Sequence, residues 1–281
     1  MNTNKKNFCK TIPDHICKVI LDGIYKVIPG AFIRHSGLDP EPSLTRSLAF
    51  LLFFPFFFLA SCSTFGDRDN PADPGASNYA EITVTTGTLT DSRDGQVYKT
   101  VTIGTQTWMA ENLNYVVDSS WCYGNSTDSC AKYGRLYQWT AAMNIASSYD
   151  SVMAGAVIKA PQQGACPVGW HVPTSGEWAA LETVVGGSGT AGTKLKSTSG
   201  WNDDNGASGN GTDDYGFSAL PAGNRYNDGD FGNAGGIAHF WSATELDASY
   251  TYSRHLYYDN VIMNTFSSNK LRAFSVRCVQ D

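Results

Sequence analysis

The chain has 281 residues, with 20 Lys and Arg against 26 Asp and Glu, which gives a formal net charge of −6. An acidic surface repels phosphate backbones, so the composition excludes nucleic acid as an expected partner. Only 16% of the residues are charged, while 28 are Gly and 7 are Trp. This composition predicts a loop-rich α+β module with aromatic core layers rather than a helical bundle.

Residues 48–60 form an apolar, Phe-rich stretch that contains Pro55. The stretch is shorter than the roughly 20 residues that a membrane-spanning helix needs, which indicates the apolar part of a signal peptide. It ends in Leu59-Ala-Ser-Cys62, which resembles the cleavage motif of bacterial lipoproteins, in which the Cys62 thiol accepts the lipid. An ordinary cleaved signal peptide with a chance Cys is the alternative.

We therefore expect three parts: residues 1–61 as an N-terminal extension plus lipoprotein signal peptide, residues 62–81 as the lipidated Cys62 and a flexible tether, and residues 82–281 as one folded domain. Residues 1–45 exceed what a signal requires, which indicates an unusual extension or a true start nearer Arg46. Lipid chains on Cys62 would attach the protein to a membrane, and Ser63 favours the outer membrane of the cell envelope, with either a surface-facing or a periplasmic domain.

The expected elements follow in chain order. Residues 82–86 and 97–103 are rich in β-branched side chains and flank the turn residues 91–95, so they predict a β-hairpin. Apolar residues at helical spacing predict a short helix over 134–144. Thr174 and Glu177 form a capping box that predicts the start of a second short helix. Residues 186–236 are too polar for regular structure apart from 217–220, and residues 241–244, 252–258 and 273–279 predict the closing strands.

Within residues 62–281 four cysteines remain once Cys62 is assigned to lipid, namely Cys122, Cys130, Cys166 and Cys278. An even number in an exported chain favours disulfides. Three pairings can be drawn, and spacing favours Cys122 with Cys130 and Cys166 with Cys278. A zinc site is the rival interpretation, but no C-x2-C spacing supports it.

Five motifs occur in order along the chain: Thr102-Ile-Gly-Thr-Gln-Thr-Trp-Met-Ala-Glu-Asn-Leu-Asn114, Tyr133-Gly-Arg-Leu-Tyr-Gln-Trp139, Cys166-Pro-Val-Gly-Trp-His-Val-Pro-Thr-Ser-Gly-Glu-Trp178, Tyr215-Gly-Phe-Ser-Ala-Leu-Pro-Ala-Gly223 and Phe240-Trp-Ser-Ala-Thr244. Together with the late Arg-Cys strand they resemble the Fibrobacter succinogenes major paralogous domain family, a family of bacterial envelope modules. That family is similar in turn to the C-type-lectin-like superfamily. The resemblance implies a C-type-lectin-like α+β fold, with two short helices on small antiparallel sheets, long irregular loops and disulfide bonds.

The stretch 201–216 holds Asp203, Asp204, Asp213 and Asp214. Hard oxygen ligands at this density suit calcium, so these four carboxylates are candidate metal ligands. Trp201-Asn-Asp203 is also similar to the Trp-Asn-Asp signature of calcium-dependent lectins, although there it lies near the final cysteine. The alternative is that the carboxylates form Asx-turns with their own backbone.

Aromatic side chains stack on the apolar faces of sugar rings, and polar groups bind the hydroxyls. Candidates for such a platform are Trp201, Tyr215, Tyr226, Trp241, Tyr257 and Tyr258. From the loop 201–230 we single out the candidate ligand-binding residues Trp201, Asn202, Asp203, Tyr215, Arg225 and Tyr226.

No catalytic arrangement stands out, because His171, His239 and His255 lie next to no candidate nucleophile. We therefore expect a protein that is not an enzyme. Two hypotheses remain. The first is an outer-membrane or cell-surface lipoprotein with a lectin-like module that recognises glycan or protein ligands through its long polar loops. The second is a structural or assembly lipoprotein of the envelope with no small-molecule ligand.

Overall fold

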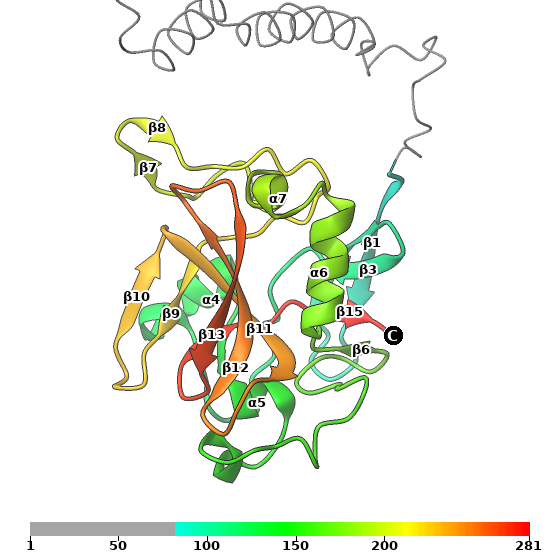
Figure 1. The fold of residues 1–281 in the computed structure, drawn as a ribbon, viewed down its shortest axis with the longest axis vertical. Helices are drawn as coiled ribbons and strands as arrows, with labels where there is room; N and C mark the ends of the chain where they lie inside the picture. Colours follow the sequence, from blue (N-terminus) through cyan, green and yellow to red (C-terminus); the bar gives the residue numbers. More distant parts are fainter. Residues whose placement is uncertain (1–81) are drawn as a thin grey trace, which may run out of the picture. The chain divides into compact units, whose positions relative to one another are not determined.

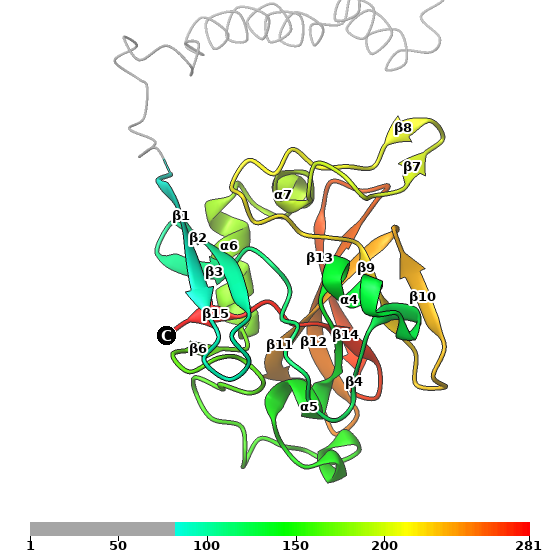
Figure 2. The ribbon, with the colours of Figure 1, turned by 180° about the vertical axis from the view of Figure 1, so that it is seen from behind.

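The computed structural model describes residues 82–281 of the chain, so the expected signal peptide, Cys62 and the tether lie outside the described residues. The described part combines a few short helices with antiparallel β-sheets and two disulfides (Figures 1 and 2). No helix within it has the length and apolar character needed to cross a membrane.

A five-stranded antiparallel sheet begins with the predicted hairpin, which is confirmed. Its strands run in the spatial order β1 (Val84–Thr90), β2 (Val97–Ile103), β3 (Gln106–Met109), β15 (Val279–Gln280) and β6 (Trp170–His171). In the turn of the hairpin, Gly95 has a φ of 77°, a conformation that glycine adopts without steric cost. The last strand thus inserts between two early segments of the sequence.

An eight-stranded sheet forms the other half. Its main path runs in the order β13 (Met263–Asn269), β12 (Tyr250–Tyr257), β11 (Ile237–Glu245), β9 (Ala222–Arg225), β14 (Ala273–Ser275), β5 (Leu136–Gln138) and β4 (Ser120–Trp121), and β10 (Phe231–Ala234) pairs with β9. A separate small hairpin joins β7 (Asp203–Asp204) to β8 (Ala207–Ser208). The closing strands predicted from the sequence are present, but the last one is split into β14 and β15.

The α-helices are α4 (Thr127–Tyr133), α5 (Trp139–Met143), α6 (Ser175–Val184) and α7 (Ser188–Leu195), with short 3-10 turns η1 (Tyr123–Asn125) and η2 (Ser147–Asp150). The capping box at the start of α6 is confirmed, because the Thr174 hydroxyl accepts from the Glu177 amide while the Glu177 carboxylate accepts from the Thr174 amide. In both views α6 lies between the two sheets (Figures 1 and 2).

Two expectations about helices are wrong in detail. The helix predicted over 134–144 is limited to α5, because Leu136–Gln138 pairs with β14 as a strand. The polar stretch 186–236, expected to be irregular, contains α7. Gly192 explains this helix, since a Cβ there would lie 2.6 Å from the Val261 carbonyl oxygen. The glycine therefore permits a close helix-to-loop contact that buries Ala191 and Leu195.

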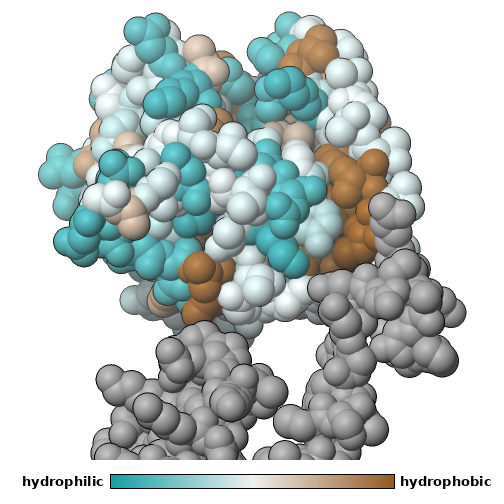
Figure 3. All heavy atoms as spheres, turned by 90° about the horizontal axis from the view of Figure 1, so that it is seen from above, coloured by the Kyte–Doolittle hydropathy of each residue, from teal (hydrophilic) through white to brown (hydrophobic). Residues whose placement is uncertain are grey.

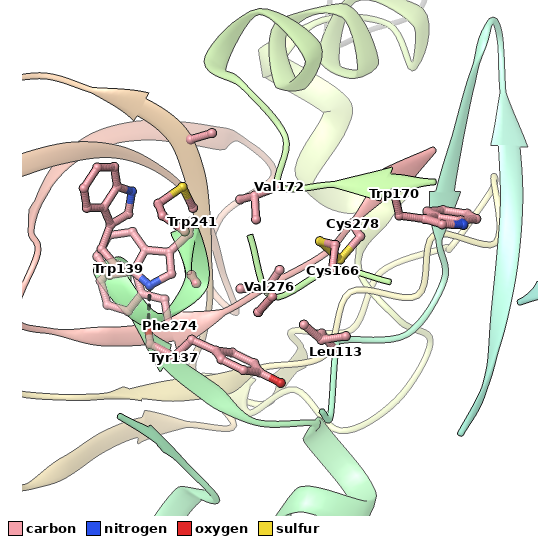
Figure 4. Packing of buried hydrophobic residues seen from close by; sticks show 14 of the residues in the cluster. Leu113, Tyr137, Trp139, Cys166, Trp170, Val172, Trp241, Phe274, Val276 and Cys278 are labelled. Carbon is pink, nitrogen blue, oxygen red and sulfur yellow. Dashed lines mark hydrogen bonds between the residues drawn. A yellow bond between two sulfur atoms is a disulfide. The ribbon is translucent and has the colours of Figure 1, made fainter. Parts of the chain in front are cut away.

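Two aromatic cores fill the space on either side of the large sheet. One lies around α6 and α7 and includes Trp108, Trp178, Phe217 and Phe240. The other contains the Cys166–Cys278 disulfide, and Figure 4 shows this bridge in the cluster that also holds Trp139, Trp241 and Phe274. The second disulfide joins Cys122 to Cys130. Both pairs are those that the spacing favours.

His171 connects α6 to the last residues of the chain. Its Nε2 and Nδ1 atoms each lie 2.7 Å from a carboxylate oxygen, of Glu177 and Asp281 respectively. Burial alone would lower the pKa of His171, but the bonds and charges of the two carboxylates outweigh burial and raise it. Its two bonds thus join the first turn of α6 to the C-terminal residue.

Arg277, the arginine of the Arg-Cys motif, is fully buried between the two cores. Its guanidinium donates to the carbonyl oxygens of Met109, Phe217 and Ser218 and to the Asn112 side chain, with the Asn112 bonds at 2.8 and 3.1 Å. It also lies 4.5 Å from the centre of the Phe217 ring. Burial lowers the pKa of Arg277 to about 9, so it remains charged at neutral pH. One side chain thus ties the final segment to strand β3 and to the polar loop before β9.

Replacing Arg277 with Leu should lower the free energy of unfolding by about 3–5 kcal/mol, because several buried acceptors lose their donor at once. Urea denaturation measures this change. Lys99→Leu, at an exposed position on β2, is the matched control and should change the stability by less than about 0.5 kcal/mol. Equal effects of the two variants would contradict the role assigned to Arg277.

Candidate functional site

A pocket opens on the face of the large sheet formed by β11, β12 and β13. It encloses about 460 Å³, within the ~300–1,000 Å³ range of small-ligand sites. We call it the histidine pocket. Most of its lining residues have aromatic or hydrogen-bonding side chains. The lining residues are Tyr226, Asn233, Ile237, His239, Tyr250, His255, Tyr257, Phe266, Ser267, Ser268, Asn269 and Arg272.

His239 and His255 form the base of the histidine pocket. They face each other across the antiparallel β11–β12 pair, with ring centres 4.3 Å apart and nearly perpendicular planes. His239 stacks on Phe274 of the core at 4.6 Å, and His255 stacks on Phe266 at 4.7 Å. The two imidazoles therefore continue the aromatic core outward to the pocket wall.

The hydrogen bonding of this pair is incomplete. The Nε2 atom of His255 lies 2.9 Å from the Ser253 hydroxyl, but His255 Nδ1 and both ring nitrogens of His239 have no partner among the described residues. Both side chains are more than nine-tenths buried, with 4% and 6% of their surface exposed. Buried polar atoms normally find partners, and each lone one calls for an explanation.

Both imidazoles are neutral at physiological pH. Burial is the main cause, and it lowers the pKa of His239 well below 6.5 and that of His255 to about 3. The positive charge of Arg272 lowers both further. A neutral imidazole presents one N–H donor and one acceptor nitrogen, the same combination that a hydroxyl group offers in return.

Tyr226 and Arg272 form one rim of the pocket. The pairing of Ala273 with Arg225 brings the β13–β14 turn next to the end of β9. As a result the Arg272 guanidinium lies 5.3 Å from the centre of the Tyr226 ring. The Tyr226 hydroxyl accepts a hydrogen bond of 3.1 Å from the Asn233 amide, which fixes the orientation of the ring.

Of the six candidate ligand-binding residues from the sequence, only Tyr226 lines the histidine pocket. Trp201 belongs to the core around α6 and α7, with 5% exposure, and its indole donates to Ser197 and Ala219. It is therefore not a stacking platform, because both faces are covered. Arg225 lies over the Trp121 ring at 4.1 Å, and Tyr215 packs against the same core as Trp201.

The remaining two candidates are exposed and do not line the pocket: Asp203 lies in β7, and Asn202 directly precedes it.

The four carboxylates proposed as calcium ligands are not gathered into one site. Asp203 and Asp204 lie on β7, and Asp213 binds the backbone amide and hydroxyl of Ser218. Across residues 82–281 there is no group of three or more His, Cys, Asp or Glu side chains that could hold a metal ion. Asp213 thus binds nearby backbone, as in the alternative interpretation, but five residues ahead rather than in an Asx-turn, and the calcium expectation gains no support from this placement.

A lysine supplies a positive charge where the loops meet. The Lys196 ammonium is buried and donates to the carbonyl oxygens of Gly209, Tyr257, Tyr258 and Asn260, at distances of 2.8–3.4 Å. It also lies 5.1 Å from the Trp201 ring centre. Lys196 thereby binds the polar loop 201–216 to the end of β12 without a metal.

Replacing Lys196 with Met should lower the free energy of unfolding by about 3 kcal/mol or more, because four buried carbonyls lose their shared donor. Lys159→Met, at an exposed position, is the control and should have little effect.

We also expect millimolar calcium to leave the melting temperature of the wild type unchanged. A calcium-induced rise that Asp203→Ala and Asp213→Ala abolish would contradict this assignment of the loop.

Sequence patterns weigh His239 and His255 only for catalysis and do not identify them as pocket residues, nor do they identify Tyr250, Phe266 and Arg272. Tyr257, a candidate for stacking, does line the pocket. Counting back from the turn between β11 and β12 does not place His239 opposite His255, because the register of this pair shifts between Trp241 and Glu245. The position of Arg272 beside Tyr226 depends on a strand pairing between distant segments, which no local pattern reveals.

Comparison with known proteins gives one match. A family model described as the Fibrobacter succinogenes major domain matches residues 101–280. No curated protein and no solved structure matches the chain. Because the family model covers well over half of the sequence, the chain belongs to the Fibrobacter succinogenes major domain family.

Proposed function

We propose that this member of the family is a cell-envelope lipoprotein whose folded domain binds glycans in the histidine pocket. The observation that carries the proposal is the set of three unpartnered imidazole nitrogens of His239 and His255 at the base of an aromatic-walled pocket. Sugar hydroxyls both donate and accept, so they complement neutral imidazoles, which need one of each.

The walls of the pocket suit a sugar ring. Tyr226, Tyr250, Tyr257 and Phe266 offer aromatic faces around the opening, and such faces stack on the apolar side of a pyranose. Phe266 covers His255 and is itself 42% exposed. A ligand that reaches the buried His255 ring therefore requires this side chain to rotate.

The disulfides of the domain support an extracytoplasmic location. On the face shown in Figure 3, hydrophilic and intermediate residues cover most of the coloured surface, and apolar residues form a few patches. Two disulfides favour an oxidising compartment. A C-type-lectin-like fold, with long loops on a disulfide-bonded scaffold, remains part of the proposal, and its binding surface would be the histidine pocket rather than the loop 201–230.

The binding proposal is tested with the full chain in detergent on a glycan array, followed by calorimetric titration of the best ligand. Tyr257→Ala should weaken binding about threefold to tenfold, because one stacking face is lost. Tyr252→Ala is the control, since Tyr252 lies two residues from Tyr250 but outside the pocket. An array on which the wild type binds no glycan would contradict the proposal and favour the assembly role in its place.

The attachment proposal rests on the sequence around Cys62, in which the thiol follows the apolar stretch at the position of a lipid acceptor. Labelled palmitate added to expressing cells should be incorporated into the wild type and not into Cys62→Ser. Cys9→Ser is the control and should keep the label, because Cys9 precedes the apolar stretch. Label that persists in Cys62→Ser would rule out lipidation at this residue.

A further inference from the structure

We infer that the histidine pocket selects acidic sugars, with the Arg272 guanidinium as the partner of a uronic acid carboxylate. This inference rests on the proposed function and specifies the ligand class of the same pocket. It starts from the charge of the pocket rather than from its aromatic walls.

Among residues 82–281, Arg272 is the one charged residue that lines the pocket, and no Asp or Glu side chain lines it. Its side chain forms no ion pair in this part of the chain. The other arginines of the folded domain are engaged: Arg93 and Arg254 pair with Asp91 and Glu182, for example. In a chain with a net charge of −6, a partly exposed cation that forms no ion pair in the described part is available for an anionic ligand.

The position of Arg272 is fixed by the fold. It lies between β13 and β14, directly before Ala273, whose pairing with β5 and β9 anchors the backbone. The Asn269 carbonyl accepts from the Arg272 amide at 3.1 Å and closes the turn. The guanidinium is thereby held over the Tyr226 ring at the pocket rim.

A uronic acid matches both parts of the site, because its carboxylate suits the guanidinium at the rim and its sugar ring suits the imidazoles and aromatic faces. A guanidinium presents parallel N–H donors that fit the two oxygens of a carboxylate. The positive charge also reaches the base of the pocket, because it contributes to the lowered pKa values of His239 and His255. A neutral sugar would use the imidazoles and aromatic faces alone, whereas a uronic acid ring would use these and Arg272 together.

The test compares two ligands with the same sugar rings, one with charged carboxylates and one with neutral methyl esters. The full chain in detergent is titrated with a trimer of galacturonic acid and with the same trimer as its methyl ester. We expect the acid to bind the wild type about 10- to 100-fold more tightly than the ester, as is typical of one charge-assisted contact. The advantage should shrink in high salt.

Arg272→Gln should bind acid and ester with equal affinity, and Arg272→Lys should retain only part of the preference. Arg225→Gln is the matched control, because Arg225 stacks on Trp121 outside the pocket and should keep the full preference. Thermal denaturation of each variant verifies that it folds.

The possible outcomes separate the two proposals. Equal binding of acid and ester by the wild type would overturn the acidic selectivity while leaving glycan binding intact. Failure of both trimers would overturn the acidic selectivity, and the glycan array then decides the fate of the binding proposal independently. Tight binding of hexaglutamate would also overturn the inference, since charge alone would then suffice.

Discussion

Buried positive charge that binds backbone carbonyls is the constraint on which this domain depends. Arg277 is the central case, because its guanidinium holds β3, the polar loop before β9 and the final segment at one point. Long irregular segments cannot satisfy their carbonyls through regular pairing, and each unpaired buried carbonyl costs free energy. A cationic side chain with several donors resolves this at one position.

The same arrangement recurs at two further sites. Lys196 donates to four carbonyls at the end of β12 and in the polar loop. Lys270 is fully buried, pairs with Glu245 at 2.6 Å and donates to three carbonyls, one of them in η2. The loops are therefore held by side chains that lie just beyond the ends of helices and strands, because Lys196 follows α7, Lys270 follows β13 and Arg277 lies between β14 and β15. Bridges such as Cys166–Cys278 add covalent support.

Against this background the histidine pocket is an exception. Four other buried side-chain atoms among the described residues also lack a partner, but they belong to four separate residues, whereas three unpartnered nitrogens belong to the two adjacent imidazoles at the base of the pocket. Natural proteins tend to break the rules of stability at functional sites, where a group is held ready for a ligand rather than for the fold. Arg272 is likewise unpaired at the rim, whereas Arg277 a few residues later has its donors engaged by the fold.

Local patterns in the sequence predict the parts of the fold whose cause is local. The hairpin around Gly95, the capping box of Thr174 and Glu177, and the two cysteine pairs follow from turn chemistry, side-chain spacing and oxidation. The strand at Leu136–Gln138 could not be found this way, since its apolar spacing fits a helix and only pairing with β14 makes it a strand.

Composition favours a different part of the surface from the one that holds the histidine pocket. Acidic and aromatic residues in the loop 201–230 resemble a binding loop, but Trp201 and Asp213 are used by the fold itself. Tyr226 alone was identified correctly as a pocket residue, because it is the one member of that set whose ring remains at an opening. The rest of the pocket arises from pairing between β11, β12 and β13 and from the contact of β14 with β9.

The most direct measurement is nuclear magnetic resonance of the ring nitrogens in protein labelled with ¹⁵N-histidine. Addition of the galacturonic acid trimer should shift the signals of His239 and His255, since their nitrogens gain hydrogen-bond partners, while the signals of His171, already bound by Glu177 and Asp281, stay in place. Unchanged signals of His239 and His255 at saturating trimer would contradict the assignment of these imidazoles to ligand binding.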